Sequence, residues 1–121
     1  MARLDIQNLK QWLAVARQSG YRASVLSKEL RISRRQLQRY TQEMFGLSPQ
    51  CWLNEQRLVL ARRLLMERRS VKEITFGLGF RQISHFSREF KLFYGLSPNA
   101  FLVWTERQNR SRDKVSWRPT S

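Results

Sequence analysis

The sequence predicts an all-α protein of seven helices, which form two helix-turn-helix subdomains joined by a long linker helix. Apolar residues recur at the three- and four-residue spacing of helices, and no segment shows the alternation of a β-strand. The chain also repeats itself, since FGLSP at 45–49 returns as YGLSP at 94–98. In both copies a proline directly follows a serine, an arrangement typical of a helix start. The repeat therefore predicts two copies of one helical unit.

The first unit, residues 1–47, contains three predicted helices. The first runs over about 5–18 and the second over about 23–30. The third begins at Ser33, because Ser33 to Gln36 has the pattern of a capping box, in which a serine accepts a backbone N–H three residues on. The residues that we expect to face the core are Ile6, Leu9, Trp12, Leu13, Ala16, Val25, Leu26, Leu30, Leu37, Tyr40 and Met44.

A Ser-Pro pair at 48–49 opens the linker helix, residues 48–69. At 1.5 Å per residue, about 20 helical residues span about 30 Å. An apolar stripe is predicted along it, formed by Trp52, Leu53, Gln56, Leu60 and Leu64. The linker helix would thus set the distance between the two units.

The second unit, residues 70–106, opens at another capping box that starts with Ser70. Gly79 supplies the turn before a helix predicted over about 82–93, and a last helix ends near Glu106. The residues that we expect in the core of this unit are Phe86, Phe90, Phe93, Phe101, Leu102 and Trp104.

The chain carries 23 lysines and arginines against 9 aspartates and glutamates, a formal net charge of +14. So large an excess indicates a polyanionic partner. Nucleic acid is favoured over a membrane, because most of the cations are arginines, which make forked contacts with phosphates and guanine edges. Part of the charge lies in residues 107–121, a basic tail in which we expect disorder.

Other classes of protein are disfavoured by composition. No apolar run approaches the roughly 18–20 residues of a transmembrane helix, and we expect neither a signal peptide nor a membrane partner. The single cysteine, Cys51, excludes an internal disulfide framework and fits a reducing, cytoplasmic location.

The helix that begins after Ser33 has the two faces that a DNA-reading helix needs, an apolar back and a front of hydrogen-bond donors. Arg35 and Arg39 stand four residues apart and so share one face. The front that we expect to contact DNA consists of Arg34, Arg35, Gln36, Gln38 and Arg39. The alternative is a solvated face of a surface helix, and the repeat favours DNA contact.

The corresponding helix of the second unit has a less basic front, with Arg88 at the position of Arg39. The residues that we expect to contact DNA are Gln82, Ile83, Ser84, His85, Ser87 and Arg88. Ile83 offers an apolar contact to a thymine methyl group, and the polar side chains offer donors. The alternative is that Ile83 and His85 only cover the edge of the core.

A resemblance now becomes specific. The segments GFRQISHFSREFK at 79–91 and YGLSP at 94–98 closely resemble the signature of the AraC/XylS family of bacterial transcription regulators. The similarity covers about residues 5–106, and it implies two recognition helices in adjacent major grooves. By this resemblance the base-reading positions are Arg35, Gln36, Gln38, Arg39, Ile83, Ser84, His85, Ser87 and Arg88.

The sequence departs from the family pattern at three positions. Arg31 stands where the first turn often has a glycine, so that a positive φ would be strained there. Leu26 and Thr75 occupy positions where a small alanine commonly lets the helices cross closely. We expect these residues to affect packing more than the fold.

We therefore expect a sequence-specific regulator of transcription that binds double-stranded DNA as a monomer, at an asymmetric and bent promoter site. The resemblance to short, stand-alone members implies an activator whose protein partner is RNA polymerase. No cofactor, metal or small-molecule ligand is indicated, and no catalytic set of residues points to an enzyme such as a nuclease. The alternative is a protein that coats nucleic acid without sequence preference.

Overall fold

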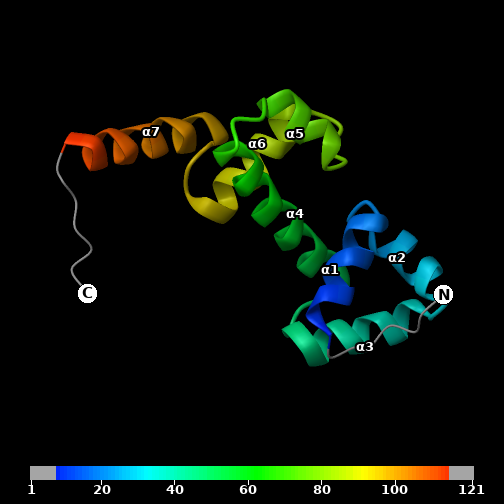
Figure 1. Cartoon of the computed structure of the whole chain (residues 1–121). Helices are drawn as coiled ribbons and strands as arrows, with labels where there is room; N and C mark the ends of the chain where they lie inside the picture. Colours follow the sequence, from blue (N-terminus) through cyan, green and yellow to red (C-terminus); the bar gives the residue numbers. More distant parts are fainter. Residues whose placement is uncertain (1–7, 115–121) are drawn as a thin grey trace, which may run out of the picture.

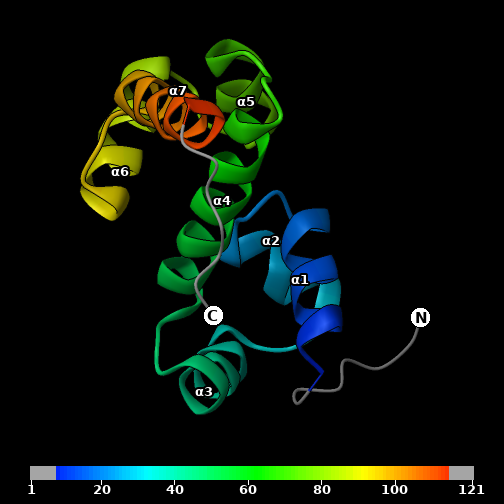
Figure 2. The ribbon, with the colours of Figure 1, turned by 60° about the vertical axis from the view of Figure 1, so that its left-hand side comes forward.

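The computed structural model describes residues 8–114, and in this part of the chain it contains seven α-helices and no strand (Figure 1). The helices are α1 (Leu9–Gln18), α2 (Ala23–Leu30), α3 (Arg34–Phe45), α4 (Pro49–Met66), α5 (Val71–Gly77), α6 (Ile83–Tyr94) and α7 (Pro98–Lys114). Helices α1 to α3 gather at one end of α4, and α5 to α7 gather at the other (Figures 1 and 2). The predicted fold class is confirmed.

Serine side chains begin four of the helices. Each serine hydroxyl accepts a hydrogen bond from the backbone N–H three residues on, at 3.0 to 3.4 Å. The capping residues are Ser33 for α3, Ser48 for α4, Ser70 for α5 and Ser97 for α7. A serine in this role satisfies an N–H that the first turn of a helix leaves unpaired, which is why these positions were readable from the sequence.

The core of the first unit is built around two tryptophans. Trp12 lies edge-on to Phe45 and to Trp52, and the rings of Phe45 and Trp52 stack with centroids 4.4 Å apart. The prediction that Leu9 and Leu13 face this core is wrong, since they are 52% and 40% exposed. The inward stripe of α1 is instead formed by Trp12, Val15 and Ala16, and the C-cap residue Ser19 is buried next to them. The large indole sets that face, and the predicted Ile6 lies outside the described residues.

The core of the second unit is a run of phenylalanines. Phe86 and Phe90 of α6 are fully buried, and Phe90 also contacts Phe101 of α7. Phe93 and Trp104 were predicted to face inward and do not, because they are 42% and 50% exposed. Both lie beside the buried face rather than on it, next to Tyr94 and Phe101 respectively.

The end of the last helix also differs from the prediction. Helix α7 runs past Glu106 to Lys114, so residues 107–114 are helical where disorder was expected. Polar and charged residues continue a helix readily when its first turns are anchored, as Phe101 anchors α7. The rest of the expected disordered tail, residues 115–121, lies outside the described residues.

Helix α4 belongs to both units, and this changes its buried face along its length. Trp52 and Leu53 are buried as predicted, but Gln56, Leu60 and Leu64 are only half-buried. The residues buried in the second half are Leu58, Ala61 and Leu65. Because α4 packs against α1, α2 and α3 near one end and α5, α6 and α7 near the other, no single stripe serves both.

The two units are not related by a single shift in residue number along their whole length. After α2 the N–H of Ile32 binds the carbonyl of Ser27, and after α5 the N–H of Phe80 binds the carbonyl of Thr75, 48 residues later in each case. From the starts of α3 and α6 onward the shift is 49, so Arg81 is one extra residue in the second turn. The small counterpart of Thr75 is therefore Ser27, not Leu26 as predicted from the family pattern.

Candidate nucleic-acid interface

Helix α3 presents its predicted front to solvent. Leu37 and Thr41 are fully buried and fix the helix against the first unit. Their burial turns the opposite face outward, and every predicted residue of that face is exposed: Arg34, Arg35, Gln36, Gln38 and Arg39. A shallow hollow is lined by Arg35, Gln38 and Arg39 together with Gln42 and Glu43 of the next turn. The structure thus brings the predicted donors together on one surface.

Arginine and glutamine side chains at this spacing suit major-groove recognition. A guanidinium pairs bidentately with guanine, and a carboxamide pairs with adenine. Arg35, Gln38, Arg39 and Gln42 fall on one side of α3 because they are three or four residues apart. The sequence pattern places Gln42 on the polar side of this helix, but it was not among the residues predicted to contact DNA.

Helix α6 buries larger side chains than α3 does, and its exposed front is less charged. Phe86 and Phe90 bury its back, and the hydroxyl of Tyr94 donates to the carbonyl of Leu58 on α4 at 3.1 Å. Burial raises the pKa of the Tyr94 hydroxyl, which keeps this donor protonated. The C-terminal end of α6 is therefore tied to the linker helix.

The predicted residues of α6 divide into two groups. Gln82, Ile83, Ser84, His85 and Arg88 are exposed, and Ser87 is half-buried. His85 Nε2 lies 3.4 Å from a carboxylate oxygen of Glu89, and its ring stands edge-on to Phe80 with centroids 5.4 Å apart. His85 thus covers the edge of the core while keeping part of its surface open.

The turns before α3 and α6 hold two arginines that were not predicted to contact DNA. Arg31 has the positive φ expected for it, 56°, and Arg81 is the extra residue of the second turn. Both are exposed and adjoin a helix N-terminus, where phosphate groups bind favourably. In the sequence, the feature that could have identified these arginines is a cation just before a predicted helix start.

Among residues 8–114 no group of histidine, cysteine, aspartate or glutamate side chains is arranged to hold a metal ion. Within the same range, no helix combines the length and apolar character needed to cross a membrane. Cys51 is a free, exposed thiol on the first turn of α4.

Comparison with known proteins supports a helix-turn-helix fold. The sequence pattern of a helix-turn-helix domain family matches residues 26–103. The HTH-type transcriptional activator RhaS of Enterobacter sp. (strain 638) is 42% identical over 77 residues, which cover 63% of this chain and 26% of that protein. RhaS of Salmonella arizonae is 41% identical over 88 residues, covering 72% of this chain and 28% of that protein.

A solved structure is also similar. The C-terminal domain of the two-component response regulator yesN from Fusobacterium nucleatum superposes with a TM-score of 0.67 and 27% sequence identity. The match covers 78% of this chain and 98% of that domain. By contrast, the chain spans only about a quarter of the length of the curated relatives it matches, 26% and 28% in the two given above.

Proposed function

Because the chain belongs to the AraC/XylS family of DNA-binding transcription regulators, we propose that it binds an asymmetric promoter site as a monomer. In this proposal α3 and α6 enter adjacent major grooves on one face of the duplex. Two recognition helices in one polypeptide make a second chain unnecessary, since each groove is met by its own helix.

The observation that carries the proposal is the pair of outward fronts at the two ends of α4. The α3 front contains Arg35, Gln38 and Arg39, whereas the α6 front contains Ile83, Ser84 and Arg88. Different side chains recognise different base edges, so the two half-sites need not share a sequence. A site without a palindrome follows from the two unlike fronts.

The length of α4 supports a bent site. Its 18 residues span about 27 Å at 1.5 Å each. Adjacent major grooves on one face of straight DNA lie about 34 Å apart. A linker helix shorter than this distance favours DNA that curves toward the protein, at an elastic cost that depends on the sequence between the half-sites.

We further propose that the bound protein activates transcription through contact with RNA polymerase. Support comes from the RhaS relatives, which are transcriptional activators. A promoter–reporter assay with added polymerase tests this part. Transcription should increase with the protein present, and a decrease would indicate repression instead.

The experiment for DNA recognition is selection of bound duplexes from a random library at moderate salt, followed by a titration of the selected site. One asymmetric sequence with two patches about one helical turn apart, bound one to one, is the expected result. The variant Arg35→Ala/Arg39→Ala should lose selectivity, while Arg63→Ala on the exposed side of α4 serves as a matched control.

Two other outcomes would contradict the proposal. A palindromic site that takes two chains would show that dimers bind. The absence of any enriched sequence would favour a protein that coats nucleic acid through charge alone.

A further inference from the structure

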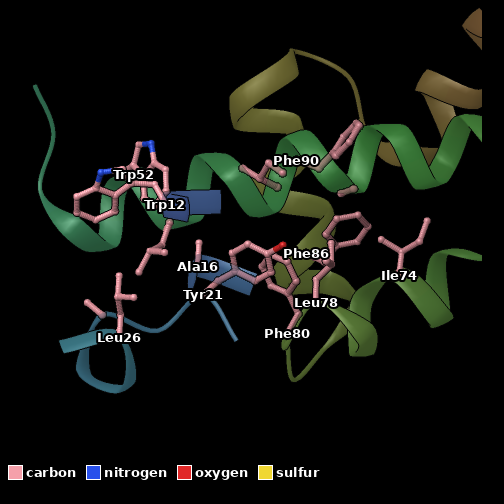
Figure 3. Close-up of a cluster of buried hydrophobic side chains, with 14 of the residues drawn as sticks. Trp12, Ala16, Tyr21, Leu26, Trp52, Ile74, Leu78, Phe80, Phe86 and Phe90 are labelled. Atoms are coloured by element: carbon pink, nitrogen blue, oxygen red, sulfur yellow. The ribbon is translucent and has the colours of Figure 1, made fainter. Parts of the chain in front are cut away.

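The two units share one core, which runs across the middle of α4. The cluster of buried side chains continues from Leu26 and Trp12 of the first unit to Phe80 and Ile74 of the second (Figure 3). Between them lies the turn after α1, where Gly20 meets the turn after α5: a side-chain carbon placed on Gly79 would lie 3.6 Å from the Gly20 carbonyl oxygen. The units therefore touch directly.

Arg57 occupies the middle of α4 at this meeting point. Its guanidinium carbon lies 3.8 Å from the centre of the Phe80 ring, so the planar cation stacks closely on that ring. One terminal nitrogen donates to Asn54 Oδ1 at 3.0 Å. The Nε atom is buried without a hydrogen-bond partner. Part of the Arg57 guanidinium is therefore covered by an aromatic ring instead of water.

The charged surroundings of Arg57 come from both units. Burial lowers the pKa of its guanidinium, and Glu89 of α6 opposes that effect. Arg22 at the start of α2 lowers the pKa further, and Tyr21 beside it raises the pKa. Arginine remains charged at neutral pH, so these groups act on a fixed positive charge. Residues of the α1–α2 turn and of α6 therefore both act electrostatically on this cation.

The ring beneath Arg57 connects it to the second recognition helix. Phe80 is 4% exposed and contacts Phe86 and His85 of α6, with centroids 5.2 and 5.4 Å away. A displacement of α4 relative to α6 would separate Arg57 from Phe80. Stacking on a desolvated ring stabilises an arrangement by about 30-fold in its equilibrium constant.

We propose that Arg57 is a positioning residue that locks the two units in one relative orientation, and so fixes the spacing between half-sites that the protein accepts. The inference rests on the proposed function for its effect on DNA, but the lock itself exists in the free protein. A locked geometry favours one half-site spacing, because other spacings require the lock to open.

The first test measures the free protein. Spin labels are attached at Gln42→Cys on α3 and Lys91→Cys on α6 in a Cys51→Ser background, and the distance distribution is recorded by pulsed electron resonance. The expected result is a narrow distribution that broadens about twofold or more in Arg57→Met, which keeps the apolar stem and removes the charge. Arg63→Met, an exposed arginine on the same helix, should leave the width unchanged.

The second test measures binding to selected sites whose spacer is lengthened or shortened by one base pair. The unsubstituted protein should bind each altered site about tenfold more weakly, whereas Arg57→Met should discriminate by less than about threefold. Helicity by circular dichroism confirms that the variants fold. Arg57→Lys retains a charge without the planar stack and should give intermediate values, and it decides the question if Arg57→Met is unfolded.

Unchanged distance widths and unchanged spacer preferences in both Arg57 variants would overturn the proposal. If the unsubstituted protein selects no site, the proposed function fails, while the distance measurement still decides whether Arg57 locks the units.

Discussion

The two helix-turn-helix units share an order of helices but fill their cores with different side chains. In the first unit Trp12 of α1 and the much smaller Thr41 of α3 are both fully buried. In the second unit the residue 49 positions after Thr41 is Phe90, also fully buried. The hydrogen bonds that end α1 recur 48 residues later at the end of α4, which makes Leu60 the counterpart of Trp12.

This comparison shows how one architecture tolerates unlike sequences. The first unit has a tryptophan on α1 and a small buried residue on α3, whereas the second has a half-buried leucine on α4 and a large buried ring on α6. It also shows that α4 has two roles, since its second half repeats α1. The fold depends on total volume and on helix ends, and the outward fronts are left free to differ.

The difference between the two cores predicts the largest effect on stability. Phe90→Ala should lower the free energy of unfolding by about 3–5 kcal/mol, because it removes a buried ring and leaves a cavity. The equivalent Thr41→Ala should lower it by only about 1 kcal/mol, since it removes a methyl group and a hydroxyl bonded to Gln38. Urea unfolding followed by circular dichroism measures both. Equal losses would mean that the two cores are not organised around residues of different size.

The recognition fronts predict the next effect. Arg39→Ala should weaken binding to the selected site by about 1–3 kcal/mol if its guanidinium contacts a base. Arg88→Ala at the equivalent position of α6 should cost less, since the α6 front relies less on charge. Titrations of the selected site and of random DNA distinguish the roles. An equal loss on both DNAs, with a salt slope reduced by about 1, assigns Arg39 to a phosphate.

The turns before α3 and α6 predict smaller changes in stability, which have opposite signs for substitutions in the two turns. Arg31 adopts φ 56° and Gly79 adopts φ 86°, a region that costs a residue with a side chain about 1–2 kcal/mol. Arg31→Gly should therefore stabilise the protein, and Gly79→Ala should destabilise it by a similar amount. A Cβ at Gly79 meets only the Gly20 oxygen at 3.6 Å, an ordinary contact, so backbone strain dominates. Thermal unfolding checks both variants, and a shared sign would refute the explanation.

The helix caps predict the smallest effect. Ser33 caps α3 through a 3.0 Å hydrogen bond, whereas Gln82 begins α6 without a side-chain cap. Ser33→Ala should cost about 1 kcal/mol of stability, and Gln82→Ser should add up to about that amount. Unfolding curves in the absence of DNA separate this effect from DNA contact. A stabilising Ser33→Ala would contradict the role of the cap.

The parts of the fold that the sequence predicted are those set by local rules. Serines such as Ser33 and Ser70 begin helices through bonds that span three residues, and such signals are local in the sequence. Gly79 adopts a positive φ in the turn that was predicted before α6, which is also a local signal. The outward placement of Arg35 and Arg39 followed from the apolar back of α3.

The parts that were missed depend on contacts across the chain. Leu13 and Trp104 have apolar side chains at plausible inward positions, and only the packing of Trp12 and Phe101 decides which face is buried. The extra Arg81 was hidden because an offset of one residue in a turn leaves both recognition helices aligned. The environment of Arg57 was not predictable, since the ring that its guanidinium contacts belongs to Phe80, in the second unit.

In the proposed complex, one chain places two unlike helices in adjacent major grooves of the DNA. The most direct measurement is affinity cleavage, with an iron chelate attached at the exposed positions Glu43→Cys on α3 or Lys91→Cys on α6, again in a Cys51→Ser background. Each derivative should cut the selected site at one end only, at opposite ends of the site and about one helical turn apart. Cleavage at both ends by either derivative, or cleavage scattered along the duplex, would contradict the account.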